Sequence, residues 1–307
     1  MKKLLLLTLL SLNLFGACLE VGTTAQSACS GDTLRVDAMN VNFSTSMKVA
    51  DTNLKVVDIP IYVFSDSMDE VKMTMANIST LRNSVNEVIS TAFYYVVNDV
   101  ESAITENQSF TLLSAAAGGR DGTSIVGYVR IKVNSLADTQ TAGSYALSKN
   151  ISVNLGNASD SPTATLSASG NVEQVSMVGF ENLATYKTGK VFKDGLVDYG
   201  NFTLNTSNEQ VKDVFVKNNT NGNFQIKFET SDLISQVDNN YKIDMSYYYT
   251  KIGATEQSIN NNEYFTIMTG KKNGTKVGVF RFITESLTGS LIAGEYKAVI
   301  NVTVSAN

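Results

Sequence analysis

The sequence predicts an all-β fold made of two tandem copies of one domain, and three observations lead to this expectation. The chain contains an internal repeat, its composition favours strands and tight turns, and its last segment alternates apolar with polar residues. The repeat is clearest where Ala142-Gly143-Ser144-Tyr145 is matched by Ala293-Gly294-Glu295-Tyr296, at an offset of 151 residues (294 minus 143). A period of roughly 150 residues indicates a duplicated domain, because solenoid repeats span only about 20 to 50 residues.

The repeat continues upstream of this anchor. Gly127–Ile131 is matched by Gly278–Phe282 at the same offset, and the aromatic run Phe93–Val97 is matched by Met245–Tyr249 with a small shift. A polar stretch of small residues at 155–162 has the composition of a linker. We therefore expect a signal peptide at 1–17, a first β-sandwich at 30–155 and a second at 163–307.

The composition supports a packed core and argues against one class of partner. Hydrophobic residues make up 43% of the chain and charged residues 17%, which is enough apolar material to bury a core in each copy. Val, Ile, Thr, Tyr and Phe favour strands, and abundant Asn, Ser and Gly favour turns. The net charge of -5 argues against a nucleic-acid binder, which needs a basic face to neutralise phosphates.

The N-terminus predicts export. Two lysines precede the mostly apolar run Leu4–Phe15 and the small residues that end at Ala17, the pattern of a secretory signal peptide. Cleavage after Ala17 would leave Cys18 at the new terminus. Cys18 would then either carry a lipid anchor or form a disulfide with Cys29 in an oxidising compartment, and the disulfide is the preferred alternative.

The last strand of each copy shows the clearest strand pattern. In the second copy one face of the strand carries Tyr296, Ala298, Ile300, Val302 and Val304. The first copy places Tyr145, Leu147, Ile151 and Val153 on the same face, but Lys149 stands where the second copy has Ile300. Alternation with a period of two predicts a half-buried strand, which at Lys149 either bulges or opens to water.

One segment fits two kinds of element. Apolar residues from Ser79 to Ile104 recur at helical spacing, whereas the matching run Tyr241–Ile252 is rich in Tyr and favours a strand. We therefore predict a short helix over Thr80–Ile89 and a strand over Ala92–Val100. With hairpin turns at Asp121-Gly122 and Asn273-Gly274, about seven strands in each copy predict two immunoglobulin-like antiparallel β-sandwiches.

Motifs for catalysis are hard to find in the sequence, and a glycosidase that uses two carboxylates is the one enzyme class left open. The absence of His excludes a serine–histidine or cysteine–histidine nucleophile and a Cys/His zinc site, and the sequence has no calcium-binding loop motif. We expect no enzyme, metal or cofactor. We interpret the acidic cluster of Asp66, Asp69 and Glu70 as a solvated turn rather than a catalytic pair. We interpret the basic loops with Arg120, Lys271 and Lys272 as solvated loop tips rather than contacts to an acidic glycan.

The last strand of each copy resembles that of chaperone-usher pilus subunits, particularly the colonisation-factor class and its spore-coat-protein-U-like relatives. The residues that carry the resemblance are Ala293, Gly294, Tyr296, Asn301, Val302, Thr303 and Val304, echoed by Ala142, Gly143, Tyr145, Asn150, Ile151, Ser152 and Val153. The resemblance implies a sandwich that lacks one strand until a partner adds an extended segment. Tyr296, Ala298, Ile300, Val302 and Val304 would then lie beside the place of the missing strand and contact a chaperone.

The resemblance implies an adhesive or structural subunit of a bacterial surface fibre, a two-domain tip or minor pilin exported through the periplasm to the cell surface. Its expected partners are a periplasmic chaperone, an outer-membrane usher, neighbouring pilus subunits and a glycan receptor on a host or surface. Two alternatives stay open. A surface lipoprotein or coat-like structural protein would carry a lipid on Cys18, and a secreted carbohydrate-binding module would be stable and bind glycans as a monomer.

Overall fold

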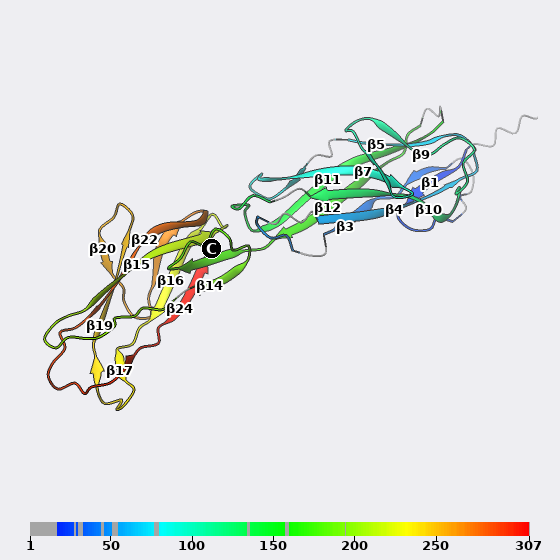
Figure 1. The fold of residues 1–307 in the computed structure, drawn as a ribbon. Coiled ribbons are helices and arrows are strands. Elements are labelled where there is room, and N and C mark those ends of the chain that lie inside the picture. Colours follow the sequence, from blue (N-terminus) through cyan, green and yellow to red (C-terminus); the bar gives the residue numbers. More distant parts are fainter. Residues whose placement is uncertain are drawn as a thin grey trace, which may run out of the picture. The chain divides into compact units, whose positions relative to one another are not determined.

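The computed structural model describes residues 17–27, 29, 33–43, 46–50, 55–76, 80–133, 136–156, 160–193 and 195–306. These residues form 24 β-strands, and no helix occurs among them, so the all-β prediction is confirmed (Figure 1). No described segment is a helix long and apolar enough to cross a membrane. The predicted signal peptide lies outside the described residues apart from Ala17.

The chain divides into two compact units. One contains the described residues within 1–44, 54–134 and 145–169, and the other those within 45–53, 135–144 and 170–307. This division differs from the predicted domain boundaries, because residues 163–169 group with the first unit. They form most of a strand that is hydrogen-bonded into the first unit's sheet.

The first unit is built from two layers of strands. One layer has the order β2-β1-β4-β10-β7-β8, and the other contains β9-β5-β11-β12-β3, with β6 pairing both β7 and β11. Pairing is antiparallel except for β1 with β2 and β12 with β3, which are parallel. The strands are β1 Leu19–Gly22, β2 Leu34–Val36, β3 Met39–Asn42, β4 Lys55–Ser65, β5 Val71–Met75, β6 Thr80–Arg82, β7 Val88–Val97, β8 Val100–Ala103, β9 Ser109–Leu113, β10 Asp121–Val133, β11 Gly143–Leu155 and β12 Thr163–Val172.

The second unit repeats this plan. Its six-stranded sheet has the order β14-β13-β15-β22-β19-β20, and two three-stranded sheets have the orders β21-β16-β24 and β18-β17-β23. An aromatic core, with Phe280 fully buried at its centre, joins the six-stranded sheet to β16 and β21. The strands are β13 Val175–Gly179, β14 Gly189–Lys193, β15 Glu209–Asn218, β16 Asn223–Glu229, β17 Leu233–Ser235, β18 Lys242–Ile243, β19 Met245–Lys251, β20 Glu256–Ser258, β21 Tyr264–Thr269, β22 Lys272–Thr284, β23 Tyr296–Lys297 and β24 Asn301–Ala306.

The predicted helix over Thr80–Ile89 is wrong. Thr80–Arg82 is β6, and Val88 begins β7, with a turn between them. Asn83 holds this turn, because its Oδ1 accepts the backbone N–H of Val85 at 3.1 Å and of Glu87 at 2.8 Å. A side chain that satisfies nearby backbone donors in this way favours a turn over a helix.

The predicted strand over Ala92–Val100 corresponds to the second half of β7. That strand ends at Val97, and a tight turn at Asn98 and Asp99 leads into β8. Both turn residues have positive φ, 48° and 63°, the geometry of a two-residue hairpin turn. The prediction therefore located the strand correctly but extended it through the turn that follows.

Candidate functional site

The last strands of the two repeats differ in the structure although they match in sequence. In the first unit β11 is one continuous strand of 13 residues. In the second unit the same stretch is divided into β23, of 2 residues, and β24, of 6 residues. The break falls at 298–300, which includes Ile300, the residue that matches Lys149. Lys149 itself lies within unbroken β11 and is half-buried.

The neighbours of these strands explain the difference. β11 has β5 and β6 on one side and β12 on the other. β24 pairs with β16 alone, so that within the described part of the chain its outer edge has no partner strand. Figure 1 shows β12 beside β3 and β11, and β24 beside β16. We call the outer edge of β24 the open edge.

Side chains are also more deeply buried in the last strand of the first unit than in that of the second. Tyr145, Ile151 and Val153 of β11 are completely buried. The five residues predicted to flank the missing strand in the second unit are only half-buried. All five pack against the apolar cores of that unit. The smaller core contacts Tyr296 and Ala298, and the larger core contacts Ile300, Val302 and Val304. Val299 between them is 77% exposed. The open edge therefore leaves apolar side chains incompletely covered.

The segment of the second unit whose sequence resembles that around β3 lacks strand pairing. In the first unit β3 runs parallel to β12, and the N–H of Phe43 donates to the carbonyl of Ser169 at 2.9 Å. The sequence Val41-Asn42-Phe43 is echoed by Val197-Asp198-Tyr199 in the second unit. Residues 195–199 form no strand there, and Leu196 is 75% exposed. Residues 195–199, unlike β3, therefore belong to no described strand.

β12 shows what a strand in this place looks like. Leu166, Ala168 and Val172 are buried at alternate positions, while Ser167 and Ser169 lie between them at half-exposed positions. The carbonyl of Pro162, just before the strand, accepts the N–H of Val153 at 3.1 Å. The strand thus contributes main-chain hydrogen bonds on both sides and small apolar side chains inward, as an added strand does.

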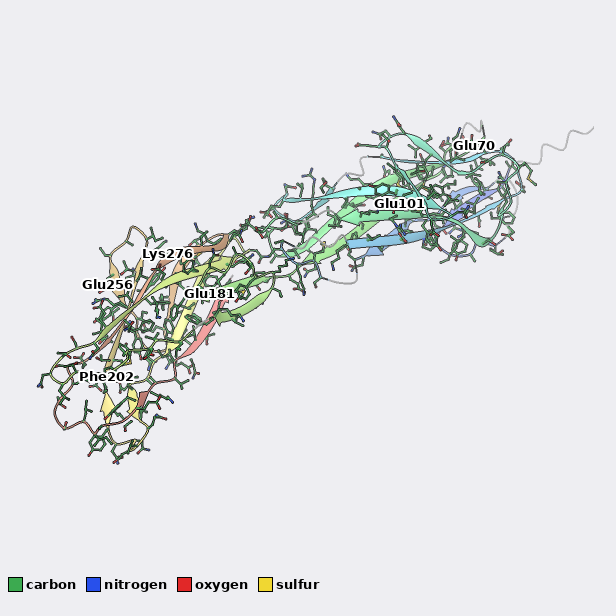
Figure 2. All side chains as sticks on the ribbon, in the orientation of Figure 1. Glu70, Glu101, Glu181, Phe202, Glu256 and Lys276 are labelled. Carbon is green, nitrogen blue, oxygen red and sulfur yellow. A yellow bond between two sulfur atoms is a disulfide. The ribbon has the colours of Figure 1, made fainter. Side chains whose placement is uncertain are left out.

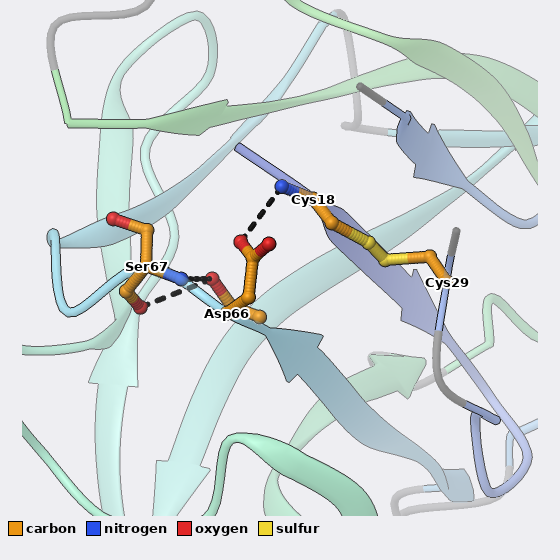
Figure 3. Close-up of a disulfide and its surroundings, with 5 residues drawn as sticks. Cys18, Cys29, Asp66 and Ser67 are labelled. Carbon is orange, nitrogen blue, oxygen red and sulfur yellow. Dashed lines mark hydrogen bonds between the residues drawn. A yellow bond between two sulfur atoms is a disulfide. The ribbon is translucent and has the colours of Figure 1, made fainter. Parts of the chain in front are cut away.

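The N-terminus of the described chain is held in the first unit (Figure 3). Cys18 is bonded to Cys29, as predicted, and is almost completely buried. The backbone N–H of Cys18 donates to Oδ1 of Asp66 at 2.8 Å, and its carbonyl accepts the N–H of Asp66 at 3.3 Å. The next residue, Leu19, begins β1. Asp66 therefore orients the terminus and is not simply a solvated turn residue.

The predicted basic loop tip at Arg120 is wrong. Arg120 is 8% exposed, and its guanidinium donates to four backbone carbonyls at 2.7–3.1 Å, those of Ser67, Asp69, Ser114 and Ala117. Burial lowers the pKa of Arg120. The side chain clamps neighbouring loops and is not available to a ligand. In the matching loop, Lys271 is half-buried and Lys272 is exposed.

Both units carry an ion-pair cluster on the outward face of the larger sheet. Arg130 contacts Asp58 at 2.6 Å and Glu101 at 2.7 Å, and Lys132 contacts Glu101 at 2.6 Å. Lys132 and Arg130 lower the pKa of Glu101. The second unit repeats the pattern, with Arg281 between Glu256 and Glu209; Figure 2 labels Glu101 and Glu256. Such exposed pairs contribute little stability each.

No group of three or more His, Cys, Asp or Glu residues suited to a metal ion occurs in the ranges that the structure describes. No protein-family model matches the sequence, and no curated protein is similar to it.

Several solved structures are similar to this chain. A chain of the CsuC–CsuE chaperone–tip adhesion subunit pre-assembly complex, from archaic Csu pili of Acinetobacter baumannii, has a TM-score of 0.47 and 12% identity over 88% of this chain and 99% of that chain. The CupB6 tip adhesin from Pseudomonas aeruginosa has a TM-score of 0.37 and 11% identity, over 95% and 93%. CfaE, the adhesive subunit of CFA/I fimbria of enterotoxigenic Escherichia coli, has a TM-score of 0.31 and 10% identity, over 87% and 91%.

Proposed function

We propose that this chain is an adhesive subunit of a bacterial surface fibre, and that its second unit accepts a β-strand from a partner at the open edge. The observation that carries the proposal is the contrast between the two repeats. β11 is covered by β12, whereas the matching β24 has no described strand on its outer edge. An exposed strand edge is a template for pairing with another chain, and natural proteins normally protect it.

The proposed partners are those that the resemblance implies, and the chemistry of this edge suits them. This edge has no described partner strand, and its apolar side chains are half-buried, so it fits an extended segment with alternating small and apolar residues, as in β12. A periplasmic chaperone would supply this segment first, and a neighbouring pilus subunit delivered by an outer-membrane usher would replace it. Exposed apolar surface of this kind causes aggregation when it is left uncovered.

The position in the fibre follows from the N-terminus. Cleavage after Ala17 would leave no residue ahead of Cys18, which is tied to Cys29 and Asp66 and precedes β1 directly. A subunit in this form accepts a strand but has no free N-terminal segment to donate. We therefore place the chain at the tip of the fibre, where a subunit needs only one connection.

Lipid anchoring competes with this arrangement. A lipid on Cys18 requires its sulfur, which the disulfide with Cys29 already uses. Intact-mass measurement of the mature protein distinguishes the two. A mass equal to residues 18–307 with two hydrogens lost supports the disulfide form, and a mass increased by diacylglycerol contradicts it.

The test of the function is immunogold electron microscopy on native cells, with an antibody to residues 163–307. We expect gold on thin fibres, concentrated at their ends. The double variant Val302→Asp, Val304→Asp, verified as folded by circular dichroism, should remove the label from fibres, because charges in the half-buried row beside the open edge oppose strand addition. The matched control is Val211→Asp on β15, where Val211 is 52% exposed, and its labelling should be normal. Label spread evenly over a surface without fibres would contradict the proposal and favour a lipoprotein or coat protein.

A further inference from the structure

A polar groove lies on the outward face of the larger sheet of the first unit. Its volume is about 480 Å³, and we call it the hairpin groove. Tyr128, Arg130 and Asp58 line it from the sheet, and Asn98 and Asp99 line it from the turn between β7 and β8. The groove is within the range of about 300–1,000 Å³ that is typical of small-ligand sites.

The polar groups of the groove are only partly engaged within the protein. No other described residue is hydrogen-bonded to the side chains of Asn98, Asp99 or Tyr128, and Tyr128 is 37% exposed. Arg130 uses three of its five N–H groups, toward Asp58 and Glu101. The hairpin turn has positive φ at Asn98 and Asp99 and fixes both residues at the rim. The groove therefore presents donors and acceptors in a preformed arrangement.

The second unit serves as an internal comparison. It shares the ion pairs beneath the groove, since Arg281 also lies between two carboxylates. It does not share the residues at the edge of the groove. Val279 stands in the place of Tyr128 (279 minus 151), and the connection from β19 to β20 runs from Lys251 to Glu256 in place of a two-residue turn. The ion pairs thus belong to the common fold, while Tyr128, Asn98 and Asp99 are particular to the first unit.

We propose that the hairpin groove binds an uncharged sugar residue of a glycan. Sugar hydroxyls both donate and accept hydrogen bonds, which suits a rim with carboxylate acceptors and guanidinium and amide donors. The apolar C–H face of a sugar ring can pack against the ring of Tyr128. The charged residues of the lining are Asp58, Asp99 and Arg130, so the lining has a net charge of -1 (one positive minus two negative). This negative charge disfavours sialic acid and sulfate. The inference rests on the proposed adhesive role and assigns it a site.

The test is an array of immobilised glycans probed with the purified mature chain, residues 18–307. The array carries glycans that end in neutral hexoses or N-acetylhexosamines beside others that end in sialic acid or carry sulfate. We expect binding to neutral ends. Titration with the methyl glycoside of the preferred sugar should then show affinity at least about tenfold lower for Tyr128→Ala and for Asp99→Ala.

The matched control is Tyr264→Ala in the second unit, because Tyr264 is also an exposed tyrosine, at 49%; its affinity should be unchanged. Circular dichroism of each variant verifies that it is folded. Three results would overturn the inference: binding to no neutral glycan, binding only to sialylated or sulfated glycans, and unchanged affinity in folded Tyr128→Ala. If the chain binds no sugar but gold labels the fibre ends, only the groove proposal is refuted. If the chain binds a neutral sugar but gold does not label fibres, only the fibre role is refuted.

Discussion

At the scale of single residues, a buried tyrosine and a glycine form the same packing contact in both units. Tyr95 donates its hydroxyl to the carbonyl of Leu112 at 3.0 Å, and Tyr249 donates to that of Ile267 at 3.4 Å. The tyrosine ring covers a glycine in each case. A Cβ on Gly127 would lie 2.6 Å from the hydroxyl oxygen of Tyr95, which is closer than atoms can pack. This contact explains why both repeat segments begin with glycine, which the sequence comparison could identify but not explain.

The first prediction concerns the hydroxyl of Tyr95. Tyr95→Phe leaves the ring in place but removes the hydrogen bond and leaves a buried carbonyl without it. We expect the free energy of unfolding of the first unit to fall by about 1–2 kcal/mol in chemical denaturation. Tyr128→Phe, on the outward face, should change it by less than about 0.5 kcal/mol. Equal effects of the two variants would show that the buried hydrogen bond is not stabilising.

The second prediction concerns alkaline pH. Burial raises the pKa of Tyr95 from 10.0 to about 12, so the folded protein keeps its proton in a range where the unfolded chain loses it. The stability due to this neutral tyrosine is complete below about pH 10 and is lost as the pH rises toward 12. Between about pH 9 and pH 11 the first unit should lose about 1 kcal/mol more in the parent than in Tyr95→Phe. An identical loss in both proteins, measured by denaturant titration, would contradict the assignment.

At the scale of elements, apolar spacing alone misassigned the segment from Thr80 to Ile89. Helical spacing places Val85 and Val88 on the apolar face of a helix, but they are 59% and 45% exposed. The buried residues are Leu81 and Ile89, which face each other across the β6–β7 hairpin. A short apolar series with exposed members fits a helix and a hairpin equally well, and only pairing with other strands decides between them.

The third prediction compares matched residues in the two last strands. Val153 is completely buried under β12, whereas Val304 (153 plus 151) is half-buried at the open edge. Val153→Ala should lower the stability of the first unit by about 1–3 kcal/mol, because it leaves a cavity in a covered core. Val304→Ala should cost the second unit less than about 1 kcal/mol. A greater cost at Val304 would show that its side chain is already covered.

At the scale of the whole molecule, the duplication and the all-β class could be predicted from the sequence, but the difference between the copies could not. The last strands resemble each other because both need an inward row of apolar residues. The difference lies in a neighbour, β12, whose residues follow the stretch that composition marked as a linker. Composition identifies a flexible connection but not which sheet the next strand joins. The groove residues Asn98 and Asp99 were likewise missed, since a tight turn gives no sign of the concavity beside it.

The most direct test of the account is to supply the open edge with a strand of known fit. By the repeat offset, Ala306 matches Leu155 (306 minus 151). A copy of residues 157–172 added after Asn307 contains the connection that follows β11 and the strand β12, so it would place a copy of β12 beside β24. Differential scanning calorimetry of the mature chain should then show the second unit's unfolding transition raised by roughly 5 °C or more, with the first unchanged. A copy that carries Asp at the position of Leu166 should give no increase. If the intact copy also leaves both transitions unchanged, the open edge does not accept a strand and the central claim is wrong.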